Sequence, residues 1–224
     1  MIVNSNYVYR FPRNTRLLPG DQHHALICDS TDGVKTMRHD ILKETWRRIA
    51  HRAGIATSVE PCMAPLRDIR DRRGGNGDRG DVLLSLPERL TVVDVSVICP
   101  SARTYVRNAS LRDGSAAAVR DQQKTRKYAS GGGAPTAFVP ISVESHGRMG
   151  KPAMDLLGTI AEAANLPEKN GSATFVGNAL RELSVALCVG NALCFHAGLK
   201  ILAQCSGSHF VAGDDRPSAD VDVG

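Results

Sequence analysis

Two aspartates stand where their charge is costly, in the stretch RGDVLLSLPERLTVVDVSV at residues 79–97. Asp81 opens one apolar run, and Asp94 lies in the middle of a second run with a valine on each side. Both runs are short and bounded by turn residues, which predicts two neighbouring strands. An ionised carboxylate inside such a strand needs a partner, because burying it alone is unfavourable. The position of Asp94 therefore predicts a cation next to it.

A third acid, Glu60, ends another short apolar run, IATSVEP at 55–61. If the three strands adjoin in one sheet, the carboxylates of Glu60, Asp81 and Asp94 can converge. Converging carboxylates favour a hard cation such as Mg²⁺ or Mn²⁺. A metal held in this way against a phosphodiester stabilises the developing charge and lowers the pKa of the attacking water. Lys124, in RDQQKTRKY, is the candidate for a further positive charge.

Simpler roles exist for most of these residues. An aspartate at a strand start, such as Asp81, is often a turn cap, and Glu60 before a proline is commonly just solvated. Lys124 and Lys127 lie in a predicted helix whose polar face is naturally charged. Only Asp94 resists such an explanation, because valines flank it on both sides.

The elements that must position these residues follow from periodicity and chain breakers. An apolar stripe at i, i+3/i+4 spacing, ended by Gly54, predicts a helix at 36–53. Strands are expected at 55–61, 81–86, 91–98 and 136–145, and further helices at 114–129, at 151–164 and, as one or two helices, at 173–204. Strands interleaved with helices predict an α/β domain with a central mixed sheet flanked by helices.

The predicted domain has irregular flanks. Residues 1–30 are expected to form an irregular N-terminal segment, residues 31–206 the domain, and residues 207–224 a loose tail. Within the domain, RDIRDRRGGNGDRG at 67–80 has no apolar periodicity and is expected to be a basic loop.

Composition favours an intracellular protein with an anionic partner. The 224 residues carry a net charge of +5 and a pI near 9, and nucleic acid is the commonest partner of a basic chain. Aromatic residues make up only 4%, which argues against an exposed base-stacking platform. The six cysteines include no CxxC pair, as expected in a reducing compartment. No signal peptide is recognisable, and no run is expected to reach the roughly 20 apolar residues of a membrane span.

The order of the candidate residues resembles the restriction-like endonuclease domain of non-LTR retrotransposons, within the PD-(D/E)XK nuclease superfamily. Arg79-Gly80-Asp81, twelve residues and Asp94 are similar to its signature of K/R-P-D, twelve to fourteen residues and D/E. The flanking features also follow the family's order: Arg38-His39-Asp40, Glu60-Pro61, Lys124 with Tyr128, FVPISVESHGRMG at 138–150 and LRELSVALCVGNAL at 180–193.

This resemblance implies a restriction-endonuclease-like fold and a Mg²⁺- or Mn²⁺-dependent DNA endonuclease of retroelement origin. It implies a nuclear protein with DNA and the reverse transcriptase portion of a longer polyprotein as partners. The metal ligands would be Glu60, Asp81 and Asp94, which would act in catalysis together with Lys124. The residues near the phosphate backbone would be Arg38, His39, Arg70, Arg72, Arg73 and Arg79.

The sequence departs from the family pattern at two positions of the signature. Gly80 replaces the proline, which is tolerable because Asp81 carries the chemistry. Ser96 stands where the superfamily has the lysine of (D/E)-x-K, and Lys124 matches a position from which some members supply that lysine instead. His24 and Cys28 match the end of a zinc knuckle, but no CxxC precedes them, so only a remnant of a knuckle is expected.

Two alternatives to a nuclease remain open. If Lys124 does not reach the acids, the same fold would serve as a catalytically inactive nucleic-acid-binding or interaction module. The chain could also be an unrelated α/β protein with structural acids. The separation of the Asp81 and Asp94 carboxyls distinguishes a nuclease from these alternatives, since a separation of roughly 4–6 Å would let them share an ion.

Overall fold

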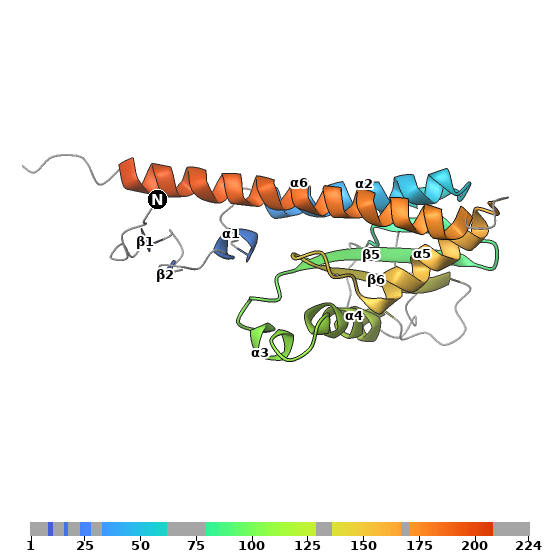
Figure 1. The fold of residues 1–224 in the computed structure, drawn as a ribbon, viewed down its shortest axis with the longest axis horizontal. Helices are drawn as coiled ribbons and strands as arrows, with labels where there is room; N and C mark the ends of the chain where they lie inside the picture. Colours follow the sequence, from blue (N-terminus) through green and yellow to red (C-terminus); the bar gives the residue numbers. More distant parts are fainter. Residues whose placement is uncertain are drawn as a thin grey trace, which may run out of the picture.

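The fold is given by a computed structural model (Figure 1). It describes residues 9–10, 16–17, 23–27, 33–61, 79–128, 136–166 and 171–207. Of the segments discussed above, the basic loop before Arg79 and the tail from residue 208 lie outside the described residues.

A four-stranded sheet in the order β3-β4-β5-β6 forms the centre of the molecule. The strands are β3 (Thr57–Val59), β4 (Val82–Ser85), β5 (Leu90–Ile98) and β6 (Thr136–Glu144). β3, β4 and β5 pair antiparallel, whereas β5 and β6 pair parallel. A parallel pair needs a crossover connection, and α4 (Ser115–Tyr128) provides it. The expected α/β architecture with a mixed sheet and flanking helices is confirmed.

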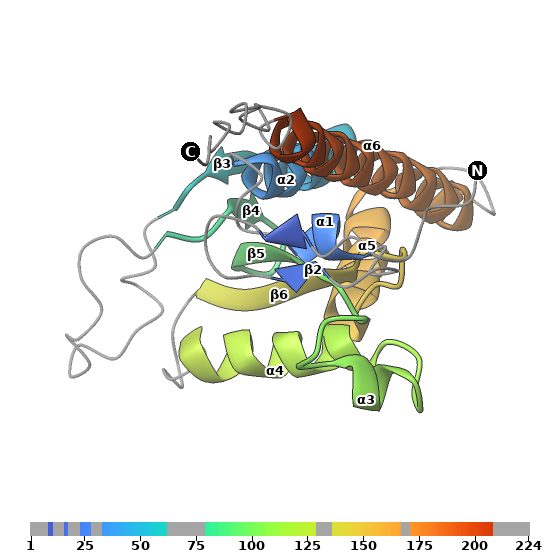
Figure 2. The same ribbon diagram turned by 90° about the vertical axis from the view of Figure 1, so that its left-hand side faces the viewer.

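Helices cover both faces of the sheet (Figures 1 and 2). α4 lies on one face, and α2 (Val34–Arg52), α5 (Lys151–Ala163) and the long α6 (Gly171–Gly207) lie on the other. The remaining elements are α1 (His24–Ile27), α3 (Val106–Ala109) and a separate antiparallel pair, β1 (Tyr9–Arg10) with β2 (Arg16–Leu17). The described part of residues 1–30 therefore contains two short strands and one helical turn rather than only irregular chain.

The two faces of β5 are chemically different. Val93 and Val95 are buried in the main core, which β5 shares with α2, α5 and α6. Val92 packs against Tyr128 of α4 in a smaller cluster on the other face. Because side chains alternate along a strand, Asp94 is on the Val92 side and faces α4. The alternation thus directs one acid away from the main core and toward the helix that carries Lys124.

The stretch expected as one or two helices at 173–204 is one continuous helix, α6. The helix over Gly171–Ile201 contains an 18-residue window with a mean hydropathy of 1.4, and it is long and apolar enough to cross a membrane by length and composition. This corrects the expectation that no such run exists. Ala179, Leu183 and Cys194 on its inner face are fully buried, so the helix also contributes to the protein's interior. The absence of membrane contact stays a prediction.

Candidate active site

Asp81 and Asp94 lie side by side on adjacent strands. In the antiparallel register Val82 is opposite Val93, so the next residues outward, Asp81 and Asp94, are opposite each other. The Asp81 N–H donates to the Val93 carbonyl at 2.9 Å, which extends the ladder to this point. The two carboxyl groups are close enough to share a hydrogen bond. The predicted pairing of these two strands is confirmed.

Lys124 reaches across from α4 to this pair of acids. Its Nζ lies 2.8 Å from Asp94 Oδ2 and donates to the Val95 carbonyl at 3.0 Å. Both charged side chains are largely buried, with 8% of the lysine and 15% of the aspartate side chain exposed. The cation that the sequence requires beside Asp94 is therefore Lys124.

Burial and mutual repulsion perturb this ion pair. Desolvation raises the pKa of Asp94, the nearby charge of Asp81 raises it further, and Lys124 only partly offsets these effects. Desolvation lowers the pKa of Lys124, against the attraction of Asp94. Two carboxylates beside a single buried ammonium leave one negative charge without a cationic partner. His39 lies close enough to pair with that charge.

His39, near the beginning of α2, contacts Asp81 directly. Its Nε2 lies 3.0 Å from Asp81 Oδ2, and the Val95 N–H donates to the same oxygen at 2.5 Å. Burial alone would raise the pKa of Asp81, but the hydrogen bond and the charge of His39, with the hydrogen bond from the Val95 N–H, outweigh it and the pKa is lowered. Burial alone would lower the pKa of His39, and its contacts with Asp81 and Asp40 reverse this and raise it. Asp81 is therefore the acid that stays ionised most readily.

Glu60 is adjacent to Asp81 in the sheet, but its carboxylate turns toward other partners. Its backbone N–H donates to the Asp81 carbonyl at 3.0 Å, and its φ of 49° is in the left-handed region. The carboxylate lies 3.8 Å from Lys43 and 3.4 Å from Arg79, and 54% of the side chain is exposed. Glu60 is thus near the pair of acids without joining it.

The donors present fit a hard divalent cation with two carboxylate ligands rather than three. Asp81 and Asp94 are ionisable, mutually repulsive and in contact, and a cation between them would relieve that repulsion. Among the described residues, no group of three or more His, Cys, Asp or Glu side chains is gathered closely enough to hold a metal ion. The expected three-acid set is therefore not assembled, since Glu60 is paired with Lys43 and Arg79.

Arg38 has a structural position, not the expected one at a phosphate backbone. The residue is 4% exposed, and its guanidinium donates to Asn191 Oδ1 at 3.0 Å and to the Leu26 carbonyl at 3.2 Å. Its side chain also packs so closely on Gly190 that a Cβ there would lie 2.4 Å from Arg38 Cγ. Arg38 thus ties α2 to α1 and α6, and its burial leaves it no surface for a ligand.

The other residues expected near phosphate have mixed positions. Arg79 has 63% of its side chain exposed and His39 has 29%, so both are accessible to solvent near the paired acids. Arg70, Arg72 and Arg73 lie outside the described residues, as does Cys28 of the knuckle remnant.

Sequence reasoning assigned no role to two cations of this neighbourhood. Lys43 lies 3.0 Å from Asp40 and is close to Glu60, and Arg120 Nε approaches the Ser96 hydroxyl at 3.5 Å. Helical spacing was the available signal: Lys43 follows His39 by four residues and Arg120 precedes Lys124 by four, so each pair shares a helix face.

Two further buried acids, Asp121 and Glu144, have roles outside this site. Glu144 accepts hydrogen bonds from the N–H groups of Ala116 and Ala117 at 3.1 and 3.2 Å, which satisfies the beginning of α4. Asp121 packs against Gly150 and Ser142, and neither of its carboxylate oxygens makes a hydrogen bond of good geometry. Burial raises the pKa of Asp121 to about 6, although the nearby Ser142 opposes the shift.

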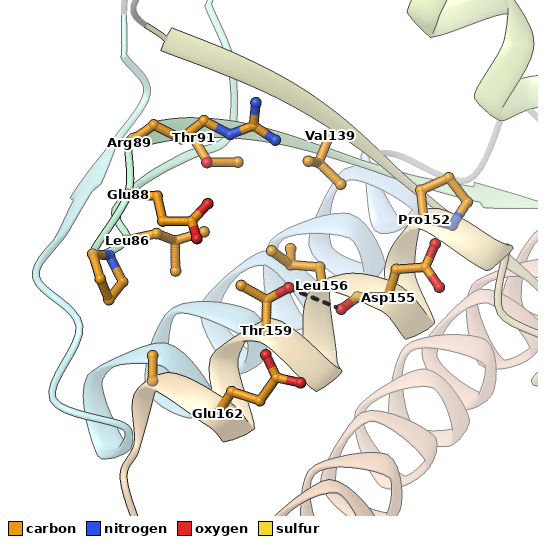
Figure 3. Close-up of a pocket in the computed structure, with 12 residues that line it drawn as sticks. Leu86, Glu88, Arg89, Thr91, Val139, Pro152, Asp155, Leu156, Thr159 and Glu162 are labelled. Carbon is orange, nitrogen blue, oxygen red and sulfur yellow. Dashed lines mark hydrogen bonds between the residues drawn. The ribbon is translucent and has the colours of Figure 1, made fainter.

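A cavity of about 520 Å³ lies on the opposite face of the sheet, between the β4–β5 turn and α5 (Figure 3). Leu86, Val139 and Leu156 give it apolar walls, and Glu88 and Glu162 add acidic groups. Thr91 lines it too, and Asp94 is the third residue after Thr91 along β5, so the two side chains point to opposite faces. The cavity is therefore distinct from the paired acids.

No protein-family model matches this chain, and no curated protein sequence matches it.

Proposed function

We propose that this chain is a metal-dependent endonuclease-like domain of retroelement origin that hydrolyses DNA phosphodiester bonds. One observation carries the proposal: Lys124 Nζ lies 2.8 Å from Asp94, whose carboxyl is in contact with that of Asp81. The resemblance requires a lysine from a neighbouring helix, because Ser96 occupies the usual lysine position. A lysine with no role at β5 would be expected to keep its ammonium in solvent, whereas only 8% of the Lys124 side chain is exposed.

The fold supports the same proposal. A mixed sheet with helices on both faces is the architecture that a restriction-endonuclease-like domain implies. The two acids come from adjacent strands and the lysine from α4, further along the chain, which is the order that the resemblance implies.

In the proposed mechanism, Asp81 and Asp94 would hold Mg²⁺ or Mn²⁺, which would supply charge neutralisation at the phosphate and a water of lowered pKa. His39 keeps Asp81 oriented and ionised through its Nε2 contact. Asp94 and the Val95 carbonyl fix the direction of the Lys124 ammonium. That ammonium stabilises the negative charge that grows on the phosphoryl oxygens. Arg79, exposed beside the acids, contacts the DNA backbone.

A catalytically inactive binding module on the same fold is the second candidate. The observation in its favour is that Glu60, the third expected metal ligand, is engaged by Lys43 and Arg79. Such a module would keep the net positive charge and the nucleic-acid partner but would need no metal. Under either proposal the chain functions in the nucleus, beside the reverse transcriptase portion of a longer polyprotein.

Nicking of supercoiled plasmid in Mg²⁺ or Mn²⁺ tests the proposal. We expect nicked product from the wild type, none in EDTA, and none from Asp94→Asn, which keeps the side-chain shape but removes the ligand charge. Gel-shift affinity for the same DNA provides the second readout. If the wild type binds DNA without nicking it, the inactive module is supported. If the wild type neither nicks nor binds DNA, the acids have a structural role only.

A further inference from the structure

One face of α6 carries an apolar stripe that nothing in the described part of the chain covers. Val185, Val189, Phe195 and Leu199 are 62%, 49%, 41% and 64% exposed, and Ala192 between them is exposed as well. Helical spacing places these five residues, here called the α6 stripe, on one side of the helix. The opposite side of α6 packs on α2, and in both ribbon views α6 forms the outer edge of the molecule (Figures 1 and 2).

The spacing of the α6 stripe is symmetric. The intervals between its members are four, three, three and four residues, so the pattern is the same from either end, with Ala192 at its centre. A second copy that packs antiparallel would set Val185 against Leu199 and Val189 against Phe195. Ala192 would meet its own copy at the two-fold axis, where a small side chain lets the helices approach closely. Such self-complementarity is the property of an isologous two-fold interface.

We propose that the α6 stripe is an antiparallel homodimer interface, whose occupant is α6 of a second copy of this chain. This inference stands independently of the proposed function, since it uses no residue of the paired acids.

Charge at the two ends of the α6 stripe supports the same occupant. Glu182 and Lys200 border the stripe, and no charged residue lies between them in the sequence. They are eighteen residues apart, which is five full helical turns, so they lie on the same flank. In an antiparallel helix pair, like flanks meet. Glu182 therefore approaches Lys200 of the partner subunit at each end, while it keeps its contact of 2.6 Å with Arg52.

Molar mass from light scattering, over a concentration series reaching roughly 100 µM, gives the first test. The monomer mass is 24.0 kDa, and we expect twice that value for the full wild-type chain. Val189→Glu buries an acid at the centre of the interface and should return the mass to that of the monomer. Leu111→Glu, a comparable change at a residue 82% exposed outside α6, should stay dimeric. A monomer mass for the wild type at every concentration would overturn the proposal.

Oxidative cross-linking tests the orientation. Ala192→Cys, made in a Cys188→Ser background, should form a disulfide dimer, because residue 192 faces its own copy. The Cys188→Ser chain alone is the baseline for all other cysteines. The yield of disulfide dimer from wild type should not exceed the yield from the Cys188→Ser chain. Antiparallel packing separates the two copies of Cys188 by about 12 Å along the helices, which is beyond disulfide reach.

Cross-linking through Cys188 would indicate parallel helices and overturn the proposal. Co-sedimentation of the monomer with phosphatidylcholine vesicles, lost in Val189→Glu, would assign the α6 stripe to a membrane surface and would equally overturn it.

Discussion

Breaking the Asp94–Lys124 pair should destabilise the protein strongly, and removing both partners should restore most of the loss. The atoms are 2.8 Å apart, where the Coulomb attraction is about 6 kcal/mol at an effective dielectric constant of about 20. Desolvation offsets part of this, so breaking such a buried pair costs about 3–5 kcal/mol. Lys124→Met should lose about that much, because it leaves Asp94 beside Asp81 without its cation. Asp94→Leu should lose a similar amount by leaving Lys124 unpaired.

The double variant Asp94→Leu/Lys124→Met should be far more stable than the sum of its parts predicts. Apolar residues of similar volume commonly replace a buried ion pair at little cost, and the repulsion between Asp94 and Asp81 disappears as well. Urea unfolding in EDTA measures all four proteins. Trp46, the only tryptophan and 2% exposed, reports the transition from the core by its fluorescence. Additive losses, within about 0.5 kcal/mol, would refute the argument that the two charges are coupled.

The loss in Lys124→Met should also depend on pH. The folded-state pKa of Asp94 is already above its unfolded value, and removing Lys124 raises it further. An acid with a raised folded pKa binds its proton more tightly in the native state, so stability falls as the pH rises through that pKa. The deficit of Lys124→Met should therefore narrow as the pH is lowered and widen as it is raised. A loss of unfolding free energy that is constant with pH would mean that the unpaired Asp94 carboxylate is not the cause of the destabilisation.

Two further predictions concern the other acids. Calorimetric titration with Mn²⁺ should show binding that Asp81→Asn and Asp94→Asn each weaken by at least tenfold, whereas Glu60→Gln has little effect because its carboxylate is engaged by Lys43 and Arg79; equal losses in all three variants would restore Glu60 to the ligand set. Asp121→Asn should stabilise the fold by up to about 3 kcal/mol above pH 7, because a folded pKa near 6 makes the native state lose stability as the pH rises from about 4. The urea curves of Asp121→Asn and wild type should converge near pH 4, and a gap that persists there would show that Asp121 acts through packing instead.

Much of the fold follows from the sequence, because its strands are short apolar runs with clear breakers. The expected helix at 36–53 is α2 at Val34–Arg52, and the expected strand at 91–98 is β5 at Leu90–Ile98. The pairing of β4 with β5 also follows, since two short apolar runs bounded by turn residues predict neighbouring strands. The continuity of α6 was harder to predict, because Gly177, Gly190 and Gly198 interrupt its apolar periodicity. Gly190 and Gly198 instead mark places where α2 and α1 pack closely.

The candidate site was partly predictable for a different reason. The valines that flank Asp94 make a nearby cation predictable from the cost of burying a lone carboxylate. The choice of Lys124 as that cation rested on its place in the following predicted helix and on the resemblance. Arg38 could not be placed in this way, because an arginine that opens a helix reads equally as a phosphate contact or as a tie between helices. Its partners, the Leu26 carbonyl and Asn191, are 12 and 153 residues away in sequence. The position of the Glu60 carboxylate could not be predicted either, since the neighbouring residues do not signal that the Glu60 backbone is in the left-handed region.

The central claim is that Lys124 serves the chemistry at Asp81 and Asp94, and a paired comparison on α4 tests it most directly. Lys124→Met and Lys127→Met remove the same charge three residues apart, but Lys127 is exposed and contacts Tyr128 at 2.7 Å. Plasmid nicking with Mn²⁺ should fall by about 10²-fold or more in Lys124→Met and stay near wild type in Lys127→Met. DNA affinity should be nearly equal in both, at a temperature where Trp46 fluorescence shows each to be folded. Equal nicking rates in the two variants would contradict the claim.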